Sequence, residues 1–228
     1  MQTIMSSDLQ PITLLGKSGP NPLKVEILLR ELNLPYAVNP VPFSDIKKPE
    51  YLAVNPNGRL PSIQDANTGL TLWESGAIVE YLIEKYDKEH RLSFQPGTPE
   101  FYHVKQWLYF QTTGQGPYYG QMTWFKKWHA EKVPSAEERY INEIKRVTGV
   151  LESHLEKQRE KFGDDGVWLV GGKLSFVDLA FIPWQRMTVM FLTKEEFDEE
   201  EFPIVKRWIK RMVDREPVKK TMEENKFL

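Results

Sequence analysis

The 228-residue sequence contains no cysteine, and this absence restricts the chemistry that the protein can perform. Disulfides, cysteine-bound metals and a catalytic cysteine are all excluded. Any thiol that reacts at this protein must therefore belong to a ligand.

Long apolar runs and an excess of one charge are also absent. No stretch of about 18 apolar residues predicts a membrane span, and no basic-then-apolar leader predicts secretion. Lys plus Arg number 30 against 32 Asp plus Glu, and this net charge of −2 gives no electrostatic reason to expect nucleic acid or a membrane as partner. The four histidines are scattered and form no metal motif, so no metal is expected. We therefore expect a soluble protein of the cytoplasm.

The first half of the chain mixes short strands with amphipathic helices. Asn21 and Pro22 are expected as the N-cap and first residue of the first helix, since both residue types are favoured there. The predicted order is strand 12–15, helix from 21, strand 36–41, one helical turn within 44–52, strands 62–65 and 70–73, and a helix after Glu74-Ser75. A βαβ unit followed by ββα fits a thioredoxin-like α/β domain, which we assign to residues 10–90.

The second half shows helical periodicity only, and we assign residues 98–228 to an all-α domain. A long helix over 101–128 is expected to kink where Gly114, Gly116 and Pro117 interrupt it. Ser135 is expected to cap the next helix. Ser175 to Asp178 forms a capping box, with a structural role, at the start of a later one.

The stretch 55–82 carries the features that suggest chemistry. Leu60-Pro61 places a proline at the start of a strand, where a cis bond would expose the main chain of Leu60. Glu74-Ser75 places a carboxylate beside a hydroxyl at a helix N-terminus, where N–H groups and the helix dipole attract an anion. The pair fits a zwitterion, with its ammonium on Glu74 and its carboxylate on Ser75.

This pattern resembles the glutathione-binding half of the cytosolic glutathione transferases. In that family the proline is cis and the Glu-Ser pair holds the γ-glutamyl end of glutathione. The helical second half and its Ser-x-x-Asp box extend the resemblance over nearly the whole chain. The segments 19–21, 73–78 and 114–118 are most similar to the fungal Ure2p-like branch and its bacterial Nu-class relatives.

The resemblance implies a glutathione site, with glutathione as cosubstrate. Glu74 and Ser75 would bind its γ-glutamyl end and the main chain of Leu60 its cysteinyl part. Arg59 would bind a glutathione carboxylate, although a surface role fits it nearly as well. Ile46 stands where the family often has a His or Gln for the glycyl end, so Lys47 or Lys48 is expected to substitute.

The same resemblance points to Asn21 as the residue that activates the thiol. A free thiol has a pKa of about 8.5, so only about 3% is thiolate at pH 7. A hydrogen bond to a charged group is worth roughly 1.5–3 kcal/mol, or about 1–2 pKa units, so one donor at a helix N-terminus suffices. Ser18 is the other candidate donor, and Gly19 replaces the Thr of Nu-class relatives. Asn21 as a helix cap alone is the simpler interpretation.

The resemblance implies further that small apolar electrophiles bind between the domains and that the protein is a homodimer. Aromatic side chains on helices belong more often to a core, but they are also the candidates for the electrophile pocket: Phe110, Tyr118, Tyr119, Trp124 and Phe125. Glutathione-dependent peroxide reduction or disulfide reduction would need the same thiolate. The alternative function is a non-catalytic regulatory or ligand-binding protein of the same fold.

Overall fold

The computed structural model describes residues 9–17 and 19–227, and its contacts divide the chain into two compact units. The first unit comprises residues 1–89 with 215–228, and the second comprises residues 90–214. This division differs from the predicted ranges at the C-terminus, because the last helix groups with the N-terminal unit. Ser18, the second candidate donor, lies outside the described residues.

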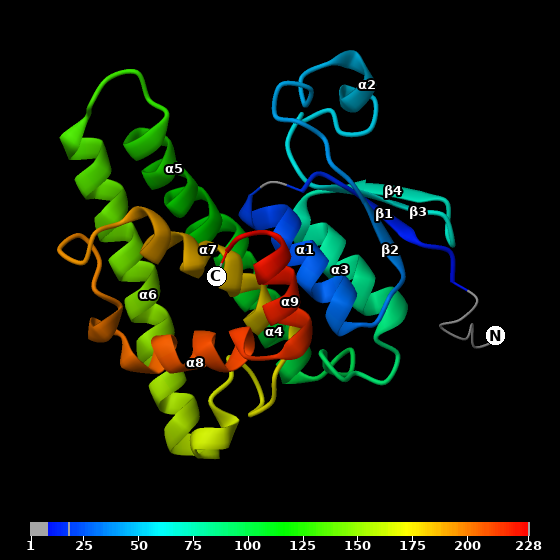
Figure 1. Ribbon diagram of the computed structural model, residues 1–228. Coiled ribbons are helices and arrows are strands. Elements are labelled where there is room, and N and C mark those ends of the chain that lie inside the picture. The colour runs from blue at the N-terminus through cyan, green and yellow to red at the C-terminus, as the bar shows by residue number, and fades with distance from the viewer. Residues whose placement is uncertain (1–8, 18, 228) are drawn as a thin grey trace. The chain divides into compact units, whose positions relative to one another are not determined.

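The first unit is the thioredoxin-like α/β fold that the pattern predicts (Figure 1). Its sheet has the order β2-β1-β3-β4, with β1 and β2 parallel and the other pairs antiparallel. In the central strand, Leu14 pairs with Val38 on one side and Ile63 on the other. The elements are β1 Ile12–Leu15, α1 Pro20–Glu31, β2 Tyr36–Asn39, α2 Pro49–Leu52, β3 Ser62–Asp65, β4 Leu70–Trp73 and α3 Ser75–Tyr86.

The N-cap of helix α1 lies two residues before Asn21, so the predicted cap is wrong. Gly19, with φ 98°, is the N-cap and Pro20 is the first helical residue. The reason is that Pro20 has a fixed φ suited to the first turn, where its missing N–H costs nothing. Asn21 is therefore the second residue of α1. The same effect makes Pro134 the first residue of α6 and Val133 its N-cap, in place of the predicted cap Ser135.

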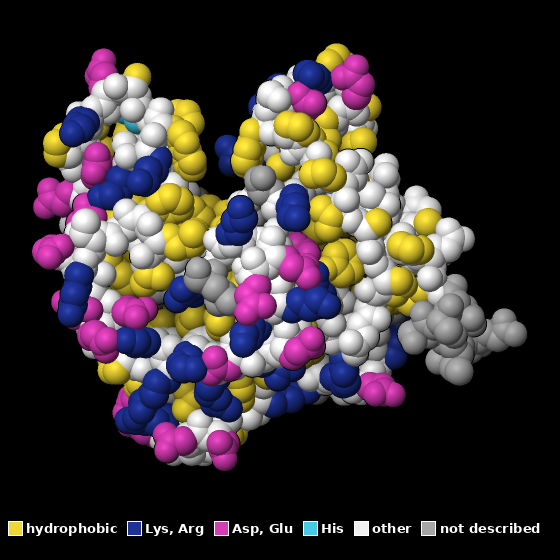
Figure 2. All heavy atoms as spheres, in the orientation of Figure 1, with side chains coloured by type: hydrophobic (Ala, Val, Ile, Leu, Met, Phe, Trp, Pro, Cys, Tyr) yellow, Lys and Arg dark blue, Asp and Glu magenta, His cyan; other side chains and the backbone are white. Residues whose placement is uncertain are grey.

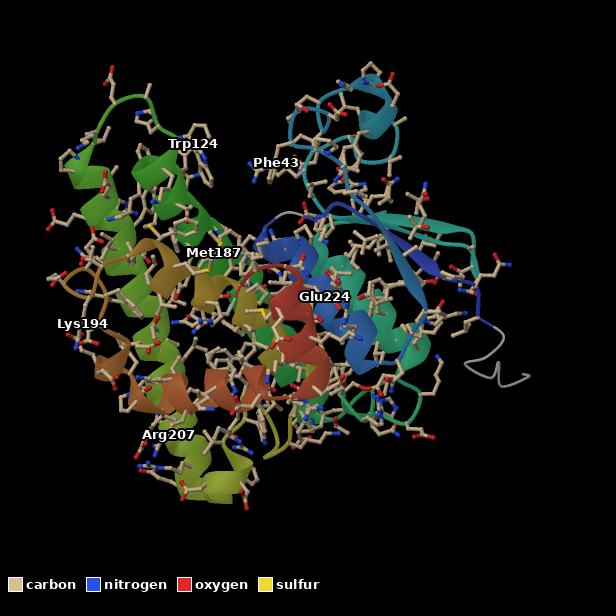
Figure 3. All side chains as sticks on the ribbon, viewed as in Figure 1. Phe43, Trp124, Met187, Lys194, Arg207 and Glu224 are labelled. Carbon is tan, nitrogen blue, oxygen red and sulfur yellow. The ribbon has the colours of Figure 1, made fainter. Side chains whose placement is uncertain are left out.

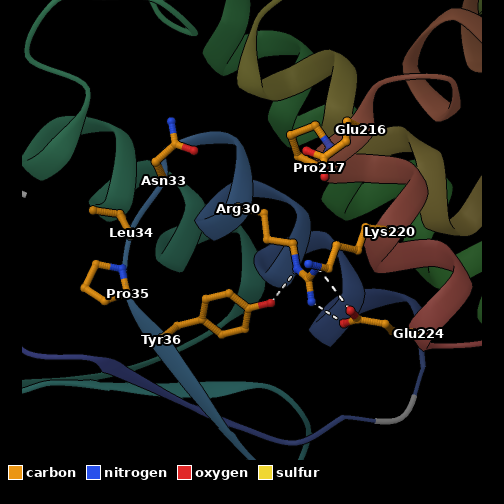
Figure 4. Close-up of a pocket in the computed structure, with 9 residues that line it drawn as sticks. All are labelled: Arg30, Asn33, Leu34, Pro35, Tyr36, Glu216, Pro217, Lys220 and Glu224. Carbon is orange, nitrogen blue, oxygen red and sulfur yellow. Dashed lines mark hydrogen bonds and ion pairs between the residues drawn. The ribbon is translucent and has the colours of Figure 1, made fainter.

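The C-terminal helix α9, Glu216–Glu224, is held on α1 by polar contacts. Arg215 donates two hydrogen bonds to the buried Glu31 at 2.6 and 2.8 Å, and Asn225 donates one to Glu26 at 3.0 Å. Arg30 pairs with Glu224 and donates to the Tyr36 hydroxyl (Figure 4). These contacts explain why a helix predicted for the second domain packs with the first unit.

The second unit is the predicted helical bundle, built around the buried helix α7 (Figure 1). Where a kink is predicted, α4 passes into one π-helical segment, η2, and then α5, so the chain widens its turn without breaking. Pro117 lies in the first turn of α5, where its missing N–H is tolerated. The elements are α4 Pro99–Phe110, η2 Gln111–Gln115, α5 Gly116–Lys127, α6 Pro134–Phe162, η3 Asp164–Gly166, α7 Phe176–Phe191, η4 Glu199–Glu201 and α8 Pro203–Val213.

The capping box at the start of α7 is confirmed, and Asp178 does more than close it. Its Oδ2 accepts from the Ser175 backbone N–H and hydroxyl at 2.9 and 2.8 Å. Its Oδ1 accepts from the Leu169 N–H at 2.8 Å and from the Trp208 indole at 3.1 Å. One fully buried carboxylate thus fixes the loop before α7, the start of α7, and α8.

Candidate active site

Glu74 and Ser75 lie at the start of α3, as the sequence predicts. Glu74 is the N-cap, and its φ of 72° lies in the left-handed region, which a non-glycine residue rarely adopts. Such a conformation costs roughly 1–3 kcal/mol and is concentrated at functional sites. It leaves the Glu74 side chain exposed, while Ser75 is only 8% exposed. The pair therefore offers an accessible carboxylate beside a recessed hydroxyl.

A buried lysine, which the sequence analysis missed, lies behind this pair. Lys24 on α1 is 2% exposed, and its Nζ donates a hydrogen bond of 3.0 Å to Ser75 Oγ. Burial lowers the pKa of Lys24 to about 7, and the negative charge of nearby Glu74 acts to raise it. The signal in the sequence is its position four residues before Leu28, at the edge of the apolar stripe of α1.

The loop before the Leu60-Pro61 bond is held by hydrogen bonds to its own backbone. Asn55, 2% exposed, donates from Nδ2 to the Arg59 carbonyl at 2.7 Å and accepts at Oδ1 from the Asn57 N–H at 3.0 Å. The Tyr51 hydroxyl donates to the same Arg59 carbonyl at 2.8 Å. Because Arg59 is anchored by its main chain, its side chain is left exposed.

The Leu60-Pro61 peptide bond is cis, as expected. The side chain of Leu60 covers Gly16 at the end of β1, where a Cβ would approach Leu60 Cδ2 to 2.8 Å. Gly16 has a φ of 106° and donates its N–H to Asn39 at 2.8 Å. A glycine is thus required where the chain passes beneath Leu60.

The two lysines proposed for the glycyl end differ in their contacts. Lys47 contacts the loop 55–60, whereas the described side-chain contact of Lys48 is with Asp45. Lys47 donates to the Asn57 carbonyl at 2.9 Å, and Asn57 in turn donates from Nδ2 to Glu74 at 3.4 Å. Lys48 pairs with Asp45 at 2.7 Å. A chain of contacts therefore joins Lys47, Asn57 and Glu74.

Asn21 is half-buried in the first turn of α1. Residues three apart on a helix share a face, so Asn21 lies one turn before Lys24, which contacts Ser75. The N-terminus of α1 supplies partial positive charge at this position. The first turn of α1 thus carries a polar amide on the same helix face as Lys24.

Comparisons with known proteins agree with this geometry. The family models described as "Glutathione S-transferase, N-terminal domain" and "Glutathione S-transferase, C-terminal domain" match residues 18–85 and 119–216. The glutathione S-transferase-like protein tpcF of Aspergillus fumigatus is 57% identical over 218 residues, which cover 95% of this chain and 97% of that protein. The chain belongs to the glutathione transferase family.

Two solved structures place this member of the family near the Ure2p-like branch, as the sequence predicts. The glutathione transferase URE2P6 of Phanerochaete chrysosporium, in complex with oxidized glutathione, matches with a TM-score of 0.88 at 49% identity, covering 98% of this chain and 100% of that one. Ure2p in complex with glutathione matches with a TM-score of 0.85 at 38% identity, covering 93% and 99%.

The aromatic residues proposed for the electrophile pocket divide into core and surface. Tyr119 belongs to the core, which corrects that prediction: it is 1% exposed, and its hydroxyl is 3.1 Å from Thr148 Oγ1 and 3.2 Å from Gln185 Oε1. The hydroxyl finds partners inside the bundle, so the whole ring is buried. Phe110 and Tyr118 are half-buried.

Trp124 differs from these residues because it is 49% exposed and extends from near the end of α5 (Figure 3). Phe125 stacks on Tyr140 with ring centroids 5.8 Å apart. Trp124 is thus the most exposed of the proposed aromatic residues, and Phe110, Tyr118 and Phe125 are half-buried.

The part of the chain that the structure describes contains neither a metal site nor a helix that could span a membrane. Among residues 9–17 and 19–227, no three His, Asp or Glu side chains gather as metal ligands. No helix in the described part of the chain is long and apolar enough to cross a bilayer. Figure 2 shows basic and acidic side chains interspersed on the face that it displays, in keeping with the near-neutral charge.

Proposed function

We propose that this protein is a cytoplasmic enzyme that binds glutathione and activates its thiol for attack on small apolar electrophiles. The observation that carries this proposal is the pair at the start of α3, where exposed Glu74 adopts a strained conformation beside a buried Ser75. Structural neighbours solved with oxidized glutathione, glutathione and S-hexylglutathione support it.

The binding mode follows from the charges and the backbone of the first unit. Glu74 would hold the ammonium of the γ-glutamyl group, and Ser75 with the α3 N-terminus would hold its carboxylate. The main chain of Leu60 would pair with the cysteinyl part. Lys47 and Arg59 are the cations for the glycyl carboxylate, and Lys47 is already oriented by its bond to Asn57.

The second substrate would be an apolar electrophile that meets Trp124, Phe110 or Tyr118. Reduction of an organic peroxide or of a disulfide uses the same thiolate, and the neighbours with oxidized glutathione favour including disulfide exchange. The alternative is a protein that binds glutathione or another ligand without turnover, in a regulatory role.

Immobilised glutathione and two assays separate these functions. We expect retention on the resin, and turnover with an aromatic halide or with cumene hydroperoxide. Retention without turnover on either substrate would favour the non-catalytic alternative. Failure to be retained would overturn the proposed glutathione site while leaving the fold unaffected.

We also propose a homodimer. Its support in the structure is the face of α4 that exposes Tyr102 and Tyr109 by 61% and 56%, since large apolar groups so placed often mark an interface. Sedimentation that detects only a species of 26.7 kDa at micromolar concentration would overturn it.

Replacing Asn21 with alanine tests the activation of the thiol. We expect kcat to fall about 10- to 100-fold, since a hydrogen bond to the thiolate is worth roughly 1.5–3 kcal/mol. The Kd for glutathione should change by less than about 3-fold, because the other contacts remain. The matched control is Asn142→Ala on the exposed face of α6. A kcat equal to that of the control would show that Asn21 serves the helix alone.

Replacing Glu74 with glycine tests whether the strain at this residue serves binding. Glycine adopts φ 72° freely, so we expect the free energy of unfolding to rise by about 1 kcal/mol. Glutathione should bind about 5- to 10-fold more weakly, because its ammonium loses a carboxylate. Glu74→Gln keeps the strain, so it should weaken binding equally without stabilising. Titration calorimetry measures the affinity for glutathione, and thermal unfolding measures the stability. A glycine variant that binds glutathione as tightly as wild type would contradict the role of Glu74 in binding the ammonium.

A further inference from the structure

Lys24 is the feature of the first unit that simple packing does not explain. It is a charged residue with only 2% of its surface exposed, and its Nζ reaches from α1 to Ser75 Oγ on α3 at 3.0 Å. Burying an ammonium is costly, and a leucine or methionine would fill the same volume without that cost. The charge is therefore expected to have a use beyond joining α1 to α3.

The bond to Lys24 fixes how the Ser75 hydroxyl can act. Below its pKa of about 7, Lys24 is an ammonium that can only donate, so Ser75 Oγ accepts from it. The single hydroxyl proton of Ser75 is then left to donate to another group. A carboxylate is the strongest acceptor for such a hydroxyl, and the N-terminus of α3 favours negative charge at the same place.

The charges around this hydroxyl match a whole amino-acid group. Lys24 and the α3 N-terminus are positive at Ser75, and the exposed carboxylate of Glu74 is negative beside it. Glu74 alone would bind any amine. With Lys24 behind Ser75, the site also favours binding of an α-carboxylate next to that amine.

We propose that Lys24 is a positioning residue of the γ-glutamyl subsite, which orients the Ser75 hydroxyl as a donor and thereby selects thiol peptides whose amino end also carries an α-carboxylate. This inference rests on the proposed glutathione site and deepens it. The ligand class is a γ-linked amino-acid peptide, as distinct from a peptide that offers an amine alone.

The test compares two ligands on wild type and Lys24→Met. Glutathione has both the ammonium and the α-carboxylate, while 4-aminobutanoyl-cysteinyl-glycine has the ammonium only. Measured by calorimetry at pH 6, below the pKa of Lys24, Lys24→Met should lose about 10- to 30-fold in affinity for glutathione and less than about 2-fold for the aminobutanoyl peptide. Lys85→Met, which removes an exposed lysine of α3, should leave both affinities unchanged.

If Lys24 had only a structural role, Lys24→Met would lose the same affinity for both ligands. That result would overturn the proposal. So would unchanged affinity for glutathione in Lys24→Met. If the methionine variant does not fold, Lys24→Gln removes the charge and keeps a polar group, and the same selective loss is expected. Wild type that binds neither ligand would instead overturn the glutathione site itself, and this inference with it.

Discussion

Replacing Asp178 with asparagine is expected to lower the free energy of unfolding by about 3–5 kcal/mol, the range for breaking a buried, hydrogen-bonded charge. All four groups around this carboxylate donate, two of them to each oxygen. An asparagine has one oxygen, so its NH2 group must face the donors of one side. The Ser175 hydroxyl can turn to accept, whereas backbone N–H groups and the Trp208 indole cannot.

The measurement is denaturant unfolding at pH 7.5. This is above the pKa of Asp178, which burial raises to about 6 against the opposing effect of its four donors, so the wild-type carboxylate is ionised. The matched control is Asp198→Asn. Asp198 also caps a short helical segment, accepting from the Glu200 N–H at 3.0 Å, but asparagine is as good a cap there. Similar small losses in both variants would show that the network adds little.

Replacing Gly16 with alanine is the second large effect that we expect, with a loss of about 2–5 kcal/mol in the free energy of unfolding. Two costs add: a left-handed φ of 106° on a residue with a Cβ, and overpacking against Leu60, whose Cδ2 would lie 2.8 Å away. Glutathione affinity should fall as well, because Leu60 must move and its main chain is proposed to bind the cysteinyl part.

A second substitution separates the two costs. Leu60→Ala removes the closest atoms, so the Gly16→Ala/Leu60→Ala protein should recover part of the stability and of the affinity. Leu60→Ala alone should change glutathione affinity by less than about 3-fold, since binding there uses the main chain. Gly97→Ala is the control for φ alone, because Gly97 has φ 87° and no atom within 4 Å of an added Cβ. Equal losses in Gly16→Ala and Gly97→Ala would contradict the proposed contact with Leu60.

Several elements could be predicted from local patterns because their physics is local. Apolar periodicity and turn residues are properties of neighbouring residues. They predicted the succession of strands and helices along the first unit, the helical character of the second and the capping box at Ser175. The pair Glu74-Ser75 was recognisable for the same reason. The hydroxyl, the carboxylate and the helix N-terminus that together could bind a zwitterion all lie within one helical turn of the sequence.

Helix starts were less predictable, because neighbouring residue types compete. Asn21 and Pro22 suited a helix start, but Pro20 suited it two residues earlier and prevailed. Likewise Gly114, Gly116 and Pro117 signalled an interruption, whereas the surrounding helices absorb it as the π-helical segment of 111–115. Local propensity indicates such a position but not which geometry the packing selects.

Composition and local pattern thus determined the fold class, the absence of cysteine chemistry and a pair that fits a zwitterion, and the resemblance to the family connected this pair with glutathione. Only the tertiary structure showed that Lys24 contacts Ser75, which follows it by 51 residues in the sequence. The burial of Tyr119 and the packing of α9 on α1 were likewise visible only in the structure. Those facts depend on which helix faces meet across the interior. The burial of a charge or a hydroxyl depends on partners distant in sequence, which no single stretch of the chain specifies.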